Sequence, residues 1–140
     1  MSQILIVAAA SVFLLLGAMH GILTLRDLRD PKVFTPRDPE LRKAMQQSSI
    51  RLHRTINLWD AWMGFNLTHS LGLVLFGAAY VYVGVFEPGA FAKSALLQAC
   101  AVLVAGIYLI LSLKFFFSKP VIGSAIGLGC FAIAAALAHV

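Results

Sequence analysis

Apolar positions gather into four long stretches that contain no Asp, Glu, Lys or Arg, and the charged residues lie between them. The stretches are Ile4–Leu25, Ala61–Phe86, Ser94–Leu113 and Pro120–Val140. A helix of roughly 20 apolar residues crosses a hydrocarbon core of about 30 Å, and each stretch reaches that length. The pattern predicts an all-α membrane protein, an antiparallel bundle of four transmembrane helices that forms a single integral membrane domain over residues 1–140.

The composition agrees with this pattern. Of the 140 residues, 60% are hydrophobic and 12% are charged, whereas soluble domains carry about a quarter charged residues. A water-soluble globular domain is therefore excluded. The first stretch differs from a cleavable signal peptide, because no charged side chain precedes it and Arg26 and Arg29 follow it. We expect it to remain as a spanning helix.

The basic residues predict how the chain is oriented. Eight of the 11 Lys and Arg residues lie between the first and second stretches, Lys114 and Lys119 flank the connection between the third and fourth, and Lys93 lies on the opposite side. Lys and Arg accumulate in cytoplasmic loops, so both termini are expected outside the cytoplasm of a multi-pass protein in the cell inner (plasma) membrane. The net charge of +5 then reflects topology and contact with the lipid bilayer. Because no stacking aromatics accompany the charges, nucleic acid is not an expected partner.

The cytoplasmic segment 26–60 has an irregular first part and a helical second part. Asp38-Pro39-Glu40 has the pattern of a helix start. A stripe at helical spacing follows, made of Leu41, Met45, Ser48, Leu52, Ile56 and Trp59. The stripe predicts an amphipathic helix over about residues 38–60 at the inner membrane surface. The basic residues mostly off the stripe are its expected membrane-surface anchor: Arg42, Lys43, Arg51 and Arg54.

Small residues predict close helix packing. Gly123 and Gly127 form a GxxxG spacing in the fourth stretch, and Gly17 and Gly21 have the same spacing in the first. Such faces let helix backbones approach in lipid. The sequence leaves open whether each contact lies within one chain or between copies.

Polar residues inside the first two stretches are the candidate site. His20 and Thr24 share one helical face with Gly17 and Gly21, and Asn66, His69 and Ser70 share a face of the second span. Counted from the cytoplasmic ends, His20 and His69 lie at similar depths, so they are expected to meet in the cytoplasmic half of the bundle. The predicted ligand-binding residues are His20, Thr24, Asn66, His69 and Ser70.

Three roles remain open for this cluster. Its side chains can hydrogen-bond between helices and act only as structural contacts. They can line a pocket for a lipophilic ligand such as a quinone. The imidazoles of His20 and His69 can also ligate a metal or haem, with Gly17 and Gly21 making room for the macrocycle. No cofactor is firmly implied.

Catalytic groups are sparse. None of the four stretches contains a carboxylate, and no Ser-His-Asp set or phosphate-binding glycine loop is present. His53 is expected to be exposed on the amphipathic helix, and His139 lies near the outer interface. No catalytic residue is predicted.

Two resemblances add to this interpretation. The segments Gly17–Gly21, Thr24–Leu28 and Phe65–Gly72 resemble a family of small uncharacterised bacterial four-helix inner-membrane proteins, which implies no activity. The layout of four spans, outer termini and a large basic loop is similar to that of the MAPEG family, small membrane enzymes of glutathione and eicosanoid metabolism. That resemblance implies trimers with glutathione at the cytoplasmic face. Arg54, Asn57 and Asp60 match the character of that family's Arg-Asn-Glu motif, but one spacing is shorter and Asp replaces Glu.

Two function classes follow. The favoured one is a non-catalytic membrane component, either an accessory subunit of a larger complex or homo-oligomer, or a binder of a lipophilic molecule or cofactor. The alternative is a MAPEG-like intramembrane enzyme acting on a lipophilic substrate, with glutathione as a cofactor held by Arg51, Arg54 or Asn57. The missing acid–base and nucleophile groups favour the first class.

Overall fold

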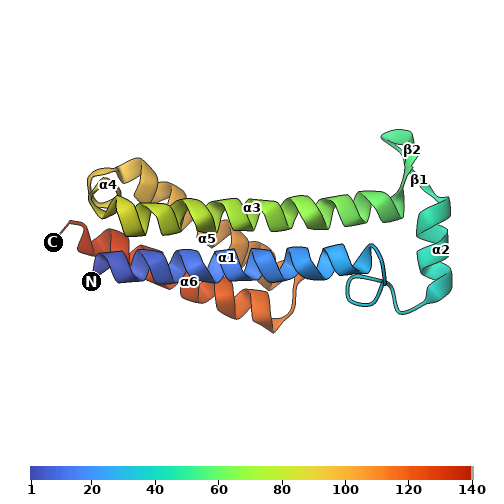
Figure 1. Cartoon of the computed structure of the whole chain (residues 1–140), viewed down its shortest axis with the longest axis horizontal. Helices are drawn as coiled ribbons and strands as arrows, with labels where there is room; N and C mark the ends of the chain where they lie inside the picture. Colours follow the sequence, from blue (N-terminus) through green and yellow to red (C-terminus); the bar gives the residue numbers. More distant parts are fainter. Residues whose placement is uncertain (140) are drawn as a thin grey trace. The chain divides into compact units, whose positions relative to one another are not determined.

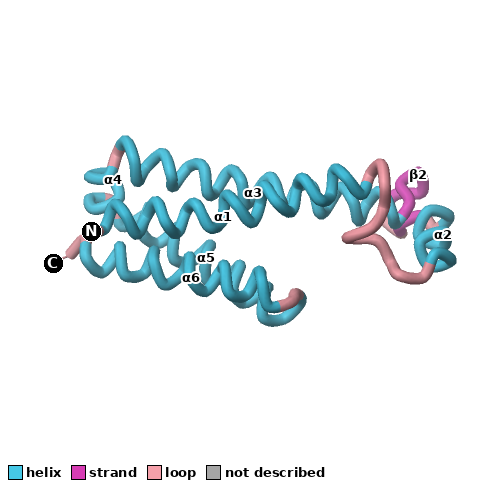
Figure 2. Tube along the Cα trace, turned by 60° about the horizontal axis from the view of Figure 1, so that its bottom comes forward, coloured by secondary structure: helices cyan, strands magenta, loops and turns pink. Residues whose placement is uncertain are grey.

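The computed structural model describes residues 1–139, which form helices and one short hairpin (Figures 1 and 2). The elements are α1 Ser2–Asp27, α2 Pro39–Gln47, β1 Ser49–Ile50, β2 His53–Asn57, α3 Leu58–Phe86, α4 Pro88–Lys93, α5 Ala95–Phe115 and α6 Ser118–Leu137. Helices α1, α3, α5 and α6 are long and apolar enough to cross a membrane. The prediction of four candidate spans is confirmed. Val140, the last residue of the predicted fourth span, lies outside the described residues.

The described chain divides into two compact units. One consists of residues 1–16 and 73–139, and the other of residues 17–72. Helices α1 and α3 each contribute a segment to both units. The candidate site lies in the second unit.

The first unit is built around an aromatic core. The buried ring of Phe13 on α1 lies 5.2 Å from Phe76 on α3, 5.9 Å from Tyr108 on α5 and 6.3 Å from Phe131 on α6, measured between ring centroids. Tyr80 on α3 adds an edge contact with Phe131 at 5.1 Å. Aromatic rings bury large apolar areas and prefer such edge or offset contacts. Phe13 therefore ties segments of four helices together.

The glycines of α6 pack within the chain. The ring of Phe13 occupies the position that a Cβ at Gly127 would need, and a Cβ at Gly123 would lie 2.7 Å from Cδ1 of Leu16. The GxxxG face of α6 therefore contacts α1 of the same chain, which answers one question that the sequence leaves open. Gly129 faces open space.

Polar groups around α4 and the start of α5 satisfy one another. The buried amide of Gln98 donates from Nε2 to the carbonyl of Phe91 at 2.9 Å, and its Oε1 lies 2.9 Å from Nε2 of His139. The hydroxyl of Tyr80 donates to the carbonyl of Leu97 at 2.8 Å. These bonds satisfy the polar groups of the buried Gln98 and Tyr80 side chains. Cys100 and Cys130 are both free thiols.

The predicted amphipathic helix over residues 38–60 is correct at its start and wrong in its extent. Asp38 caps α2 by accepting from the N–H of Glu40 at 2.9 Å, but α2 ends at Gln47 after nine residues. Residues 49–57 then form the antiparallel β1–β2 hairpin, visible beside α2 in Figure 2.

The hairpin replaces the helix for a local reason. Ile50, Thr55 and Ile56 are β-branched, which lowers helix propensity and favours strands. Helix α2 buries none of its residues. A longer helix would therefore gain no packing energy to offset the strand preference of these β-branched residues. Leu52, expected on the apolar stripe, is 92% exposed.

Candidate functional site

The polar cluster of residues 17–72 brings α1 and α3 together. Nε2 of His20 lies 3.0 Å from Oδ1 of Asn66. The rings of His20 and His69 meet edge to face, with centroids 5.3 Å apart. The expectation that the two histidines meet agrees with this geometry, and both imidazoles are partly exposed.

Asn66 determines which nitrogen of His20 carries the proton. Its Nδ2 donates to the carbonyl of Trp62 at 2.8 Å, which turns Oδ1 toward His20. Because Oδ1 only accepts, Nε2 of the neutral His20 ring must carry the hydrogen. Nδ1 then keeps the lone pair. Asn66 itself is buried.

The two hydroxyl side chains of the cluster bond to helix carbonyls. Ser70 donates to the carbonyl of Gly17 at 2.7 Å, and Thr24 donates to the carbonyl of His20 at 2.8 Å. Ser70 also fills the position that a Cβ at Gly21 would need. Both hydroxyl residues are buried, so they contribute to the packing of α1 against α3. Among the predicted ligand-binding residues, the partly exposed imidazoles of His20 and His69 are the groups that a ligand can reach.

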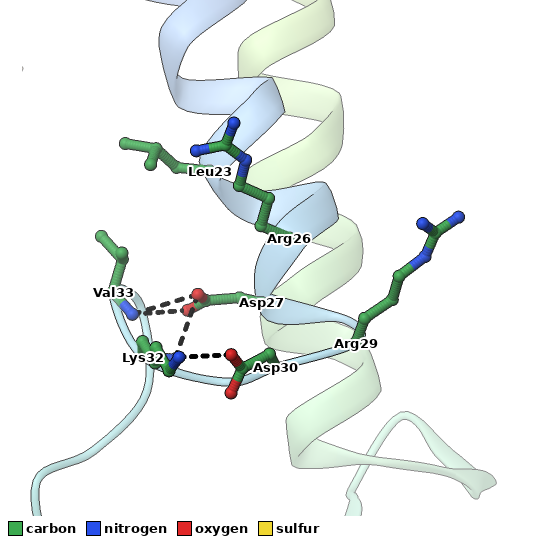
Figure 3. A pocket seen from close by; sticks show the side chains of 7 residues that line it. All are labelled: Leu23, Arg26, Asp27, Arg29, Asp30, Lys32 and Val33. Carbon is green, nitrogen blue, oxygen red and sulfur yellow. Dashed lines mark hydrogen bonds and ion pairs between the residues drawn. The ribbon is translucent and has the colours of Figure 1, made fainter.

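A buried aspartate folds the loop after α1 back on itself. The carboxylate of Asp27, 1% exposed, accepts from the backbone N–H groups of Lys32 at 3.1 Å, Val33 at 2.9 Å and Phe34 at 2.6 Å. Figure 3 shows this carboxylate turned toward Lys32 and Val33. All its partners are donors, which is what an ionised carboxylate requires.

The folded loop places the ring of Phe34 against His20. The ring centroid of Phe34 lies 4.5 Å from that of His20, and the carbonyl of Phe34 accepts from Nε1 of Trp62 at 2.9 Å. On the α3 side, Phe65 stacks with His69 at 6.3 Å. The two imidazoles are thus flanked by phenyl rings.

Asp27 and Phe34 are not among the site residues predicted from the sequence. The sequence holds one signal: Asp27 follows the predicted first span by two residues, at the C-terminal end of α1, where the helix dipole disfavours negative charge. An acid there indicates donors from elsewhere. Nothing in the sequence points to Phe34.

A haem held between the two histidines does not fit this arrangement. An iron with two axial imidazoles needs its flat macrocycle between the rings. Here the rings of His20 and His69 contact each other directly, Nε2 of His20 bonds to Asn66, and Ser70 fills the space beside Gly21. Within residues 1–139, no group of three His, Cys, Asp or Glu side chains is placed to hold a metal ion.

The basic and MAPEG-like residues lie on different elements. Arg42 and Lys43 lie on α2, whereas Arg51 lies in the hairpin turn and Arg54 on β2.

Asn57 accepts from the backbone N–H of Asp60 at 2.7 Å, and its amide donates to the carboxylate of Asp60 at 2.9 Å. These two residues cap the start of α3, and Arg54 is exposed on the preceding strand.

We expect Asn66→Ala to lower the free energy of unfolding by about 1–2 kcal/mol, because it removes an interhelical hydrogen bond and leaves Nε2 of His20 without its acceptor. Thr68→Ala is the matched control, since the exposed hydroxyl of Thr68 bonds only to carbonyls of its own helix. Thermal unfolding in one detergent measures both. Equal melting temperatures for the two variants would contradict the assigned role of Asn66.

No protein-family model, curated protein or solved structure matches this chain. The functional assignment therefore depends on the geometry of the site alone.

Proposed function

We propose that the chain is a non-catalytic, multi-pass protein of the inner membrane that binds a lipophilic molecule beside His20 and His69. In this proposal the four spans form an antiparallel bundle, both termini lie outside the cytoplasm, and residues 26–60 lie inside it. The observation that carries the proposal is the edge-to-face pair of partly exposed imidazoles between Phe34 and Phe65.

The chemistry of this pair suits a flat or hydroxylated head group on an apolar tail. Nδ1 of His20 keeps a lone pair that can accept from a hydroxyl, because Asn66 holds the proton on Nε2. The phenyl and imidazole faces can stack on a planar ring. A quinol combines both features with a lipid-soluble tail, so it represents the expected class of ligand.

The neighbouring side chains favour binding over catalysis. The hydroxyls of Thr24 and Ser70 are buried and donate to backbone carbonyls. The nearest acid in sequence to the histidine of α1, Asp27, bonds to loop N–H groups. A general acid–base pair or an activated nucleophile needs a geometry that these residues do not offer.

The glutathione-dependent alternative receives less support. It requires Arg54 and Asn57 to hold an anionic thiol together, but both oxygen and nitrogen atoms of the Asn57 amide are bonded to Asp60. The accessory-subunit alternative remains an outcome of the test below.

Native mass spectrometry of the gently extracted protein tests the proposal. We expect the 15.1 kDa chain, or a multiple of it, to carry a reproducible small added mass whose value identifies the ligand class. His20→Leu should lose that mass, whereas His53→Leu, a change at an exposed residue of β2, should retain it. Circular dichroism and melting temperature establish that both variants fold.

Two results would contradict ligand binding at this site. One is an added mass that persists in folded His20→Leu. The other is wild-type chain that is released with a larger unrelated protein and no small molecule, which would indicate an accessory subunit.

A further inference from the structure

Two recesses lie side by side at the C-terminal end of α1, and Arg26 and Arg29 line both of them. The first, drawn in Figure 3, has a volume of about 400 Å³ and is lined by Leu23, Arg26, Asp27, Arg29, Asp30, Lys32 and Val33. The second also has a volume of about 400 Å³ and is lined by Ile22, Leu25, Arg26, Leu28 and Arg29.

The acids around these recesses are already engaged. The carboxylate of Asp27 accepts from the N–H groups of Val33 and Phe34. Asp30 forms an ion pair with Lys32 and thereby raises the pKa of that lysine. Neither Arg26 nor Arg29 forms an ion pair within residues 1–139. The two guanidinium groups therefore leave a positive charge at the recesses without a partner.

Apart from its two arginines, the second recess has an apolar lining. Ile22, Leu25 and Leu28 are each at least half exposed in the second recess. Figure 3 shows Arg26 extending back along α1 beside Leu23, while Arg29 projects away from Asp27. A cation next to exposed leucine and isoleucine suits a ligand that carries both an anionic group and hydrocarbon.

We propose that Arg26 and Arg29 bind the phosphate of an anionic phospholipid, with its hydrocarbon along the second recess. Guanidinium groups form bidentate bonds with phosphate oxygens, and basic residues just cytoplasmic of a span attract anionic lipid. In the second recess, Ile22, Leu25 and Leu28 contact the hydrocarbon. This lipid site is separate from His20 and His69 and does not depend on the ligand proposed there.

Lipid retention by the full chain tests this site. The protein is equilibrated in micelles with equal amounts of phosphatidylglycerol and phosphatidylcholine, and bound lipids are counted by native mass spectrometry. We expect preferential retention of phosphatidylglycerol by the wild-type chain. Arg26→Gln/Arg29→Gln should weaken it by about fivefold for each arginine removed. Lys114→Gln/Lys119→Gln removes the same charge from α5 and α6, outside the recesses, and should retain the wild-type preference.

Several results would overturn the proposal. A wild-type chain without preference for phosphatidylglycerol would do so, and so would equal losses in the two double variants, which indicate diffuse attraction. Displacement of the lipid by millimolar inorganic phosphate would indicate a soluble phosphate ligand instead. If Arg26→Gln/Arg29→Gln does not fold, Arg26→Lys/Arg29→Lys keeps the charge without bidentate geometry, and unchanged retention there would contradict the phosphate contact.

Discussion

Gly77→Val is expected to lower the free energy of unfolding by about 1–3 kcal/mol, the range found for overpacked interiors. A Cβ at Gly77 on α3 would lie 2.5 Å from the backbone nitrogen of Leu14 and 2.8 Å from the carbonyl oxygen of Ala10, both on α1. Backbone atoms cannot rotate away as a side chain can. The helices must therefore separate locally, which also loosens the contacts of Phe13 nearby on α1.

Gly64→Val is the matched control for this prediction. Gly64 lies on the same helix, and a Cβ there meets nothing within 4 Å. Valine has a higher helix propensity than glycine, so the control should be neutral or more stable by less than about 1 kcal/mol. Melting temperatures in the same detergent compare the two variants. If both melt like the wild type, α1 and α3 do not approach as closely at Gly77 as described.

Asp27→Asn is expected to release the loop that follows α1, at a cost of about 3 kcal/mol or more. Hydrogen bonds to a charged acceptor contribute roughly 1.5–3 kcal/mol each. An amide has one accepting oxygen where the carboxylate has two, so the N–H groups of Lys32, Val33 and Phe34 cannot all be satisfied. Phe34 should then leave His20.

Hydrogen exchange detects this release residue by residue. In Asp27→Asn the amides of Lys32, Val33 and Phe34 should exchange much faster, and the emission of Trp62 should change because its indole N–H loses the carbonyl of Phe34. Asp30→Asn removes only an exposed ion pair with Lys32, so it should leave the exchange unchanged. Unaltered protection in Asp27→Asn would show that the carboxylate does not hold the loop.

The sequence predicts those parts of the fold that depend on local composition. The charge-free stretches correspond to α1, α3, α5 and α6 within a few residues, because helix length and hydropathy are set by the bilayer. The start of α2 is equally local, since Asp38 followed by Pro39 satisfies a free helix N–H.

The end of α2 shows where periodicity fails. An apolar stripe continues through Leu52 and Ile56, but a stripe stabilises a helix only when it is buried against something. Leu52 is 92% exposed and Ile56 is 41% exposed. The β-branched residues then favour strands, and their propensity was a better guide than their spacing.

For a similar reason, only part of the candidate site can be predicted from the sequence. Equal depth brings His20 and His69 together, and that follows from helix geometry. The position of Phe34 depends on loop N–H groups that bind Asp27 from five to seven residues away. No periodic pattern encodes such bonds. Likewise, Gly77 belongs to no GxxxG pair, although a Cβ added at Gly77 would lie closer to α1 (2.5 Å) than one added at Gly123 (2.7 Å).

Both proposed sites lie around the connection between α1 and α3, and the proposed orientation places residues 26–60 of that connection inside the cytoplasm. Single cysteines, placed by Leu52→Cys in the exposed hairpin turn or by Gly89→Cys in α4, can be introduced after Cys100 and Cys130 are changed to alanine. The probe is a membrane-impermeant maleimide added to spheroplasts.

We expect the cysteine at position 89 to be labelled in intact spheroplasts and the cysteine at position 52 only after the membrane is permeabilised. Labelling of position 52 in intact spheroplasts, with position 89 protected, would contradict the proposed orientation. Labelling of both positions from outside would contradict a spanning α3.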